Sequence, residues 1–263
     1  MAENRQDDEK LLGHDPFEGM DLSWLDEDEP PAKPTMETAA PEASVPEPAL
    51  GVTAITPVGP SAPQATFHFP ADFRWGVATS AHQVEGDNTN NDWWLWEQEE
   101  GHIKDGRRSE KACEWWKSTD ADFDRAAEMG LNAMRLSVDW SRVEPSPGEY
   151  DDAAMARYGE MLQGLRERNI EPMVTLHHFA IPQWLAEQCG LENAGTVVRF
   201  CRFHRHITEG LGDYCDLWCT INEPNVYAFL GYLDSTWPPG KTDFKVAMLV
   251  IRHLLLAHAA AYG

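Results

Sequence analysis

The feature that most constrains this chain is an alternation of apolar, strand-like runs with amphipathic helical runs, which begins near residue 66. Strands are expected over 74–80, 133–140, 171–179 and 216–224. Helices are expected over 120–130, 151–169, 196–212 and 243–263. Strands that alternate with helices form parallel sheets through crossover connections. The apolar runs of the strands further predict a sheet that is covered on both faces.

The spacing of the four strand–helix units predicts long loops. Successive units are about 40–60 residues apart, whereas a minimal strand–helix–strand unit needs only about 30. In parallel α/β folds, the loops at the carboxyl ends of the strands carry the functional groups. The residues that follow each expected strand are therefore the first place to look for chemistry.

The first 65 residues differ sharply in composition from the rest of the chain. They hold 14 acidic residues, three basic residues and ten of the 18 prolines. Proline interrupts helices and central strands, and the segment has too little large apolar surface to offset the ordering of the chain. We therefore expect a disordered acidic tail over 1–65 and a folded domain over 66–263. An alternative for residues 14–29, which include Phe17 and Trp24, is a docking motif that folds on a partner.

Net charge and cysteine usage exclude several classes of partner. The formal net charge of −23 argues against nucleic acid and against anionic membrane surfaces. No stretch reaches the roughly 18 consecutive apolar residues of a membrane span, and the acidic start does not resemble a secretory signal. Five cysteines without a CxxC pair indicate free thiols in a reducing compartment, so we expect a cytoplasmic protein.

Each expected strand ends in polar or aromatic residues. The sets are Gln83 and Glu85 after the first strand, Arg135 in the second, His177, His178 and Phe179 at the third, and Asn222 and Glu223 at the fourth. A carboxylic acid at a strand tip beside an amide is a candidate proton donor, and a buried arginine needs an anion. Seven aromatic residues around these positions offer flat apolar faces: Trp93, Trp94, Trp96, Phe179, Trp184, Trp218 and Trp237. Aromatic faces beside planar polar groups and acids indicate a carbohydrate ligand.

Four motifs make a family resemblance specific. They are FHFPADFRWGVATSAHQVEG, RLSVDWSRVEPSPGEYD, VTLHHFAIPQWL and LWCTINEPNVYAFLGY, in that order from about residue 67. Together they resemble the corresponding segments of the glycoside hydrolase family 1 β-glycosidases. The resemblance implies an α/β fold, the (β/α)8 TIM barrel, of which about the first four βα units are present here.

The resemblance also implies roles for individual residues. Glu223 matches the general acid/base, and Asn222 matches the residue that binds the sugar 2-hydroxyl. Gln83 and His178 match sugar-binding residues, and Phe179 stands where an aromatic residue of the sugar subsite usually stands. Arg135 matches the arginine that lies under the nucleophile and keeps it ionised.

The implied reaction is retaining hydrolysis of a small-molecule β-glycoside, which needs a second carboxylate as nucleophile. In the family this nucleophile lies on the seventh strand, in a T-E-N-G-like segment. The Glu-Asn pair at Glu192 and Asn193 follows the third strand and is in the wrong place. We therefore expect the chain to be an N-terminal half that is inactive by itself. The sugar, the leaving group and the oligomeric state stay open.

The sequence also raises two other functions. The first is a non-catalytic protein, either a sugar-binding remnant or an inert truncated homologue. The second is metal binding by His177, His178, His204 and His206, which we reject because strand neighbours point to opposite faces and residues i and i+2 of a helix do not converge. We expect no metal and no cofactor.

Overall fold

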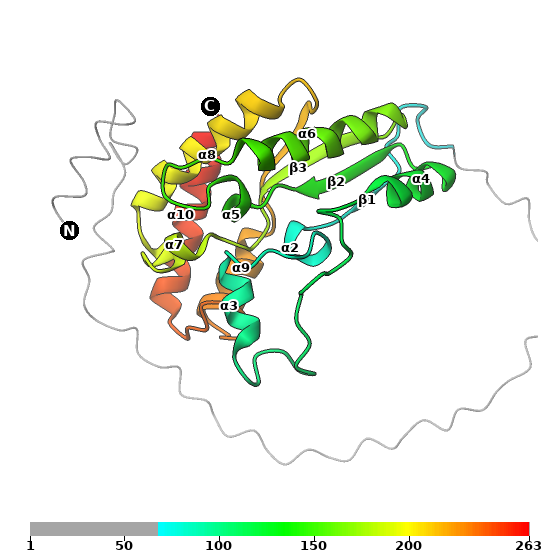
Figure 1. Cartoon of the computed structure of the whole chain (residues 1–263). Helices are drawn as coiled ribbons and strands as arrows, with labels where there is room; N and C mark the ends of the chain where they lie inside the picture. Colours follow the sequence, from blue (N-terminus) through cyan, green and yellow to red (C-terminus); the bar gives the residue numbers. More distant parts are fainter. Residues whose placement is uncertain (1–67, 263) are drawn as a thin grey trace, which may run out of the picture. The chain divides into compact units, whose positions relative to one another are not determined.

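The structure, a computed structural model, describes residues 68–262. Four parallel strands form one sheet: β1 (Gly76–Ala78), β2 (Ala133–Ser137), β3 (Glu171–His177) and β4 (Leu217–Ile221). Their order in the sheet is β1-β2-β3-β4, so each strand pairs with the next one in the sequence (Figure 1). This sequential order is that of a (β/α) barrel, whereas a doubly wound sheet reverses direction at its centre. The expectation of four parallel βα units is confirmed. The predicted tail over 1–65, with its alternative docking motif, lies outside the described residues.

One long helix follows each strand. These helices are α4 (Asp120–Glu128), α6 (Asp152–Glu167), α8 (Gly195–Leu211) and α10 (Phe244–Tyr262). Crossovers of the same hand place consecutive helices on the same side of the sheet. Accordingly, α6 packs on α4 and α8, and α8 packs on α10. Figure 1 shows α6 and α8 side by side along the sheet.

Local signals start and stop these helices. The Asp151 carboxylate accepts hydrogen bonds from the amides of Ala153 and Ala154, at 2.8 and 3.1 Å, and so caps the start of α6. Gly130 follows α4 with φ of 77°, a left-handed conformation that glycine adopts without steric cost. The predicted helix boundaries therefore agree with the structure to within a few residues.

The loops after the strands contain shorter helices that the sequence analysis did not assign. They are α2 (Ala81–Val84), α3 (Asp92–Gln98), α5 (Trp140–Val143), α7 (Gln183–Ala186), the 3-10 helix η2 (Gly190–Glu192) and α9 (Pro224–Tyr232). Except for α9, these helices have seven residues or fewer, which is too few to show a helical period. They lengthen the loops at the carboxyl edge of the sheet and position the candidate site residues there.

The hydrophobic core lies between the sheet and the helices. Val174 and Leu176 of β3 and Leu162 and Leu165 of α6 are buried in it, together with Phe203 of α8. A smaller cluster joins α9, η2 and α10. Burial of this apolar surface is the main favourable term for the fold.

The sheet is not covered evenly, which corrects the expectation of burial on both faces. The inner strands β2 and β3 are largely buried, but all three residues of β1 are exposed and β4 is half-buried throughout. The physical reason is position, because β1 and β4 are the two edges of the sheet within the described residues.

Helix α10 has the length and mean hydropathy of a membrane span, with a value of 1.5 for its most apolar 18-residue window. Within the fold it packs on α8, α9, η2 and β4, and its buried residues include Val250, Leu254 and Ala257. The apolar side chains of α10 therefore have a structural role in this fold, which is packing against these elements.

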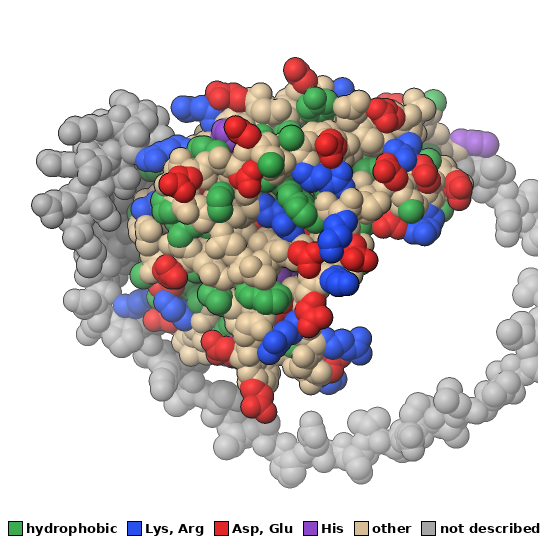
Figure 2. Space-filling view, viewed as in Figure 1, with side chains coloured by type: hydrophobic (Ala, Val, Ile, Leu, Met, Phe, Trp, Pro, Cys, Tyr) green, Lys and Arg blue, Asp and Glu red, His purple; other side chains and the backbone are tan. Residues whose placement is uncertain are grey.

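The visible surface intersperses acidic and basic side chains (Figure 2). Arg168, for example, contacts both Asp120 and Asp124, at 3.1 and 2.6 Å. Exposed ion pairs of this kind contribute little to stability.

Candidate functional site

The six candidate residues lie on the strands or just after their carboxyl ends. Gln83 is in α2, Arg135 in β2, His178 and Phe179 directly follow β3, and Asn222 and Glu223 directly follow β4. Because the four strands are parallel, these ends lie along one edge of the sheet. Residues from four separate segments of the sequence are thus placed along the same edge.

The adjacent histidines His177 and His178 have different environments. His177 is buried and packs edge-on against the Tyr227 ring, with centroids 5.1 Å apart, and burial lowers its pKa to about 3. His178 is half-buried, and burial together with the positive charge of Arg135 lowers its pKa to about 4. Its Nδ1 has no hydrogen-bond partner among the described residues. His178 is therefore a neutral imidazole beside the end of β3.

Arg135 is a half-buried cation without a carboxylate partner in the described part of the chain. Its Nη1 lies 3.9 Å from the Cys219 sulfur, and its strand position pairs in register with Met173. Burial of a charge is costly unless an anion accompanies it. The arrangement around Arg135 is therefore suited to an anion that residues 68–262 do not supply.

Asn222 and Glu223 continue directly from β4. The backbone amide of Asn222 donates a 2.9 Å hydrogen bond to the backbone carbonyl of His177. This bond holds the buried Asn222 in line with the end of β3. Glu223 then turns into the left-handed region, with φ of 45°, and Pro224 begins α9. This turn leaves the Glu223 side chain exposed.

Two of the six residues have an uncommon backbone conformation. Besides Glu223, Phe179 has a positive φ, of 75°. Non-glycine residues with positive φ are rare, and such conformations cluster at functional sites. At both residues the chain turns away from the sheet directly after a strand.

Three aromatic rings from three separate segments, Trp93, Phe179 and Trp237, lie together at this edge. The Trp237 ring lies 4.7 Å from Phe179 and 5.2 Å from Trp93, measured between centroids. We call Trp93, Phe179 and Trp237 the aromatic wall. His178 contacts the wall through Phe179, at 5.0 Å.

Other aromatic residues that the sequence analysis grouped with the site lie elsewhere. Trp184 is buried in the core and donates to the Glu144 carbonyl at 2.9 Å, and Trp96 stacks on His102. No local pattern distinguishes them from Trp93 and Trp237, because the distinction depends on which loops meet.

Gln83 is exposed, and no hydrogen bond within residues 68–262 joins its side chain to the other candidates. Two residues further on, Glu85 is buried, and its carboxylate is 2.7 Å from Arg142 Nε and 2.8 Å from the donating Tyr158 hydroxyl. Burial raises the pKa of Glu85 to about 7. Glu85 therefore anchors the segment that carries Gln83, and the partners that hold it were not evident from the sequence.

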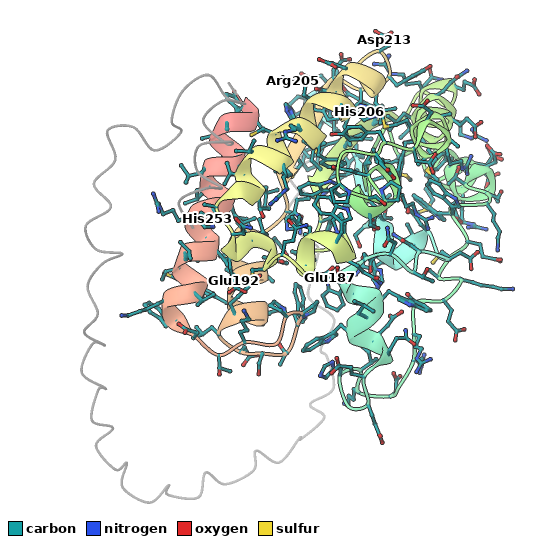
Figure 3. All side chains as sticks on the ribbon, turned by 60° about the vertical axis from the view of Figure 1, so that its left-hand side comes forward. Glu187, Glu192, Arg205, His206, Asp213 and His253 are labelled. Atoms are coloured by element: carbon teal, nitrogen blue, oxygen red, sulfur yellow. The ribbon has the colours of Figure 1, made fainter. Side chains whose placement is uncertain are left out.

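Other acidic residues singled out in the sequence pair with neighbouring side chains or backbone within the fold. Glu192 is paired with Lys241 at 2.6 Å, and Glu144 accepts hydrogen bonds from Trp140 and Gly148. Within residues 68–262 no three His, Cys, Asp or Glu side chains are placed to hold a metal ion. Figure 3 shows His206 on α8 and His253 on α10, in the helical layer.

The chain is similar to known proteins over this same region. The family model for glycosyl hydrolase family 1 matches residues 65–263. A β-galactosidase of Pyrococcus woesei is 32% identical over 250 residues, covering 74% of this chain and 49% of that protein. The β-glucosidase A of Acetivibrio thermocellus is 32% identical over 199 residues, covering 73% and 44%.

Solved structures give the same result for the fold. A β-glycosidase from Pyrococcus horikoshii superposes with a TM-score of 0.70 at 38% identity, covering 74% of this chain and 45% of that one. The β-glucosidase from Thermotoga maritima, in complex with a substituted glucoimidazole, superposes with a TM-score of 0.72 at 32% identity, covering 73% and 46%. The chain thus spans about half the length of the relatives it matches.

Proposed function

Because the chain belongs to glycosyl hydrolase family 1, we propose that the protein is a retaining β-glycosidase with Glu223 as its general acid/base. One observation carries the assignment. The segment Thr220-Ile221-Asn222-Glu223-Pro224 leaves β4 and turns at Glu223, so that its carboxylate is exposed next to the buried Asn222. The relatives are named β-galactosidase and β-glucosidase, which supports a terminal β-linked sugar as substrate.

The sugar-binding part of the proposal uses the groups along the same edge. His178 supplies a half-buried neutral imidazole, and Asn222 and Gln83 supply side-chain amides for the ring hydroxyls. The aromatic wall offers an apolar face beside them. Polar groups that fix hydroxyls next to an aromatic face suit a neutral, polyhydroxylated ligand.

The catalytic part of the proposal needs two carboxylates. Glu223 would protonate the leaving oxygen while a second carboxylate, about 5–5.5 Å away, attacks the anomeric carbon, and Glu223 would then take a proton from water. We assign the second carboxylate to a position facing Arg135, in the half of the family fold that this chain does not span. The absence of an anion beside Arg135 among the described residues supports that assignment.

Leaving-group dependence in the full-length protein tests the role of Glu223. Glu223→Gln should abolish turnover of alkyl β-glycosides, whose poor leaving groups need protonation, and should spare the glycosylation step with dinitrophenyl β-glycosides. Azide should accelerate turnover of the variant by attacking the glycosyl-enzyme without base assistance. Glu209→Gln, which changes an exposed acid on α8 away from the proposed site, is the control. Equal losses on both substrates without azide rescue would show that Glu223 is not the acid/base.

A sugar-binding protein without hydrolysis is the second candidate. It is favoured by the observation that the described residues contain His178, Asn222 and the aromatic wall but no carboxylate paired with Arg135. Saturable binding of glucose or galactose, with no release of aryl leaving group from any aryl β-glycoside, would support this candidate over the enzyme.

A further inference from the structure

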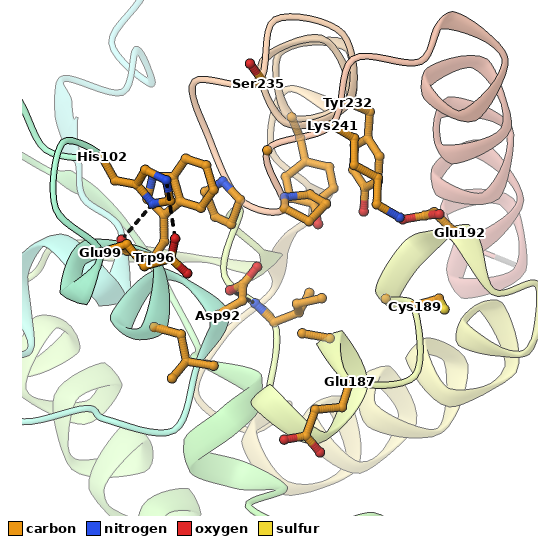
Figure 4. A pocket seen from close by; sticks show the side chains of 18 residues that line it. Asp92, Trp96, Glu99, His102, Glu187, Cys189, Glu192, Tyr232, Ser235 and Lys241 are labelled. Carbon is orange, nitrogen blue, oxygen red and sulfur yellow. Dashed lines mark hydrogen bonds and ion pairs between the residues drawn. The ribbon is translucent and has the colours of Figure 1, made fainter.

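A cavity of about 660 Å³ lies beside the candidate site, between α3, α7, η2 and the 233–243 loop that joins α9 to α10 (Figure 4). We call it the lateral cavity. None of the six candidate site residues lines it. Its volume is in the range of small-molecule sites.

The charged groups of the lateral cavity are predominantly carboxylates. Asp92, Glu99, Glu187 and Glu192 line it, whereas the Lys241 ammonium lies 2.6 Å from Glu192 and is already paired. His102 lies 3.5 Å from Glu99. The cavity therefore presents an excess of negative charge, which favours a cationic occupant.

Asp92 is the most buried of these acids, and only one of its two carboxylate oxygens accepts hydrogen bonds in the described structure. It is 8% exposed, and its Oδ1 accepts hydrogen bonds from the Ile181 and Trp93 amides at 2.9 and 3.0 Å. No hydrogen bond to Oδ2 occurs within the described residues, and Figure 4 shows the carboxylate directed into the open centre of the cavity. Burial raises the pKa of Asp92 to about 7, and a neighbouring cation would favour its ionised form.

The other walls of the lateral cavity indicate an organic cation. Ile181, Pro238 and Pro239 supply apolar surface, and no cluster suited to a metal ion occurs among residues 68–262. Tyr227, which is 1% exposed, adds its buried ring to the same lining. Apolar surface beside carboxylates suits a cation that carries an alkyl body.

We propose that the lateral cavity binds a small protonated organic amine, with the ammonium group on Asp92 and the alkyl body against Ile181 and the Pro238–Pro239 segment. The proposal is independent of the glycosidase assignment, because it uses none of the residues assigned to sugar binding or catalysis. A diamine suits the site best, because Glu99 and Glu187 offer a second carboxylate to its other end.

Isothermal titration calorimetry on the full-length protein tests the proposal with matched ligands. We expect 1,5-diaminopentane to bind at least about tenfold more tightly than 1,5-pentanediol, which has the same chain and no charge. 1-Aminopentane should fall between the two. Equal affinities for the diamine and the diol would overturn the proposal, as would absence of diamine binding at concentrations on the order of 10 mM.

Two variants locate the site. Asp92→Asn keeps an oxygen for the Ile181 and Trp93 amides and should weaken diamine binding at least about tenfold. Ala186→Leu should weaken it similarly by filling the cavity, without touching any charge. Asp213→Asn, an exposed acid outside the cavity, is the matched control and should bind the diamine as the wild type does. Unchanged affinity in both cavity variants, or an equal loss in the control, would place the amine elsewhere and overturn the proposal.

Discussion

The Arg142 guanidinium lies 2.7 Å from the buried carboxylate of Glu85, 57 residues away in the sequence. Tyr158 of α6 donates to the same carboxylate at 2.8 Å and accepts a 2.9 Å hydrogen bond from the Asp139 amide. The cluster thus ties the loop after β1 to the loop after β2 and to the helix behind them. The cluster holds the segment that carries Gln83 in place, and none of its members is one of the six candidate site residues.

Breaking this pair should be costly. Arg142→Met leaves the buried Glu85 carboxylate without its cation, and we expect the free energy of unfolding to fall by about 3–5 kcal/mol. Urea denaturation of the full-length protein measures the loss. Arg107→Met, which removes an exposed ion pair with Asp105, should change stability little. The double variant Glu85→Gln with Arg142→Met should recover part of the loss, and a fully additive result would contradict the coupling.

Asp92 should make stability depend on pH. Its pKa of about 7 in the folded protein lies above the ordinary value of 3.8, so between these values the folded state holds a proton that the unfolded chain releases. The contribution of this carboxyl to stability is therefore highest below about pH 4 and is lost as the pH rises through 7. Relative to Asp92→Asn, we expect the wild type to lose at most about 4 kcal/mol across this window.

Urea denaturation of both proteins at about pH 5 and pH 8 measures the part of that difference that falls between pH 5 and 7, at most about 3 kcal/mol. Asp87→Asn is the control, because Lys117 holds the pKa of Asp87 below its ordinary value of 3.8, so this carboxylate is ionised in both states at both pH values and its contribution should not change between them. If the stability gap between the wild type and Asp92→Asn stayed constant with pH, the shift in the pKa of Asp92 would be refuted.

Gly86 and Gly130 should respond differently to the same substitution. Both have positive φ, of 74° and 77°. A Cβ on Gly86 would lie 1.9 Å from the Lys111 carbonyl oxygen, whereas a Cβ on Gly130 would meet nothing within 4 Å. Gly130→Ala should cost only the conformational strain, about 1–2 kcal/mol. Gly86→Ala should cost clearly more, because backbone must move, and thermal melting of the two variants compares them directly. Similar melting temperatures would contradict this prediction, because they would show that the backbone at Lys111 moves away from the added Cβ at little cost.

Residues 66–263 produced in isolation should self-associate. β1 and β4 form free edges of the sheet within the described residues, and Val77 on β1 is 43% exposed. Open edges with apolar side chains promote pairing between chains. Gel filtration should show oligomers that Val77→Lys reduces. Met129→Lys, which removes an apolar side chain that is 69% exposed away from the sheet, should not reduce them. A clean monomer with a sharp thermal transition would contradict this prediction.

Much of the fold was predictable from local pattern. The strand of residues 171–179 and the helix of residues 151–169 appear as β3 and α6 because apolar spacing and capping residues are local properties. The positions of Asn222 and Glu223 at a strand end were predictable for the same reason. The short helices α3 and α7 were not predictable, because seven and four residues are too few to show a helical period. Both helices nevertheless line the lateral cavity.

The sequence by itself determined four parallel βα units, the residues at their carboxyl ends and, through its motifs, the family. Only the tertiary structure decided that His177 is buried against Tyr227 while His178 is half-buried, and that Glu85 is held by Arg142. It also decided that Trp237 joins Phe179 while Trp184 enters the core. The physical reason is that secondary structure follows from neighbours along the chain, whereas burial and side-chain pairing depend on which distant segments pack together.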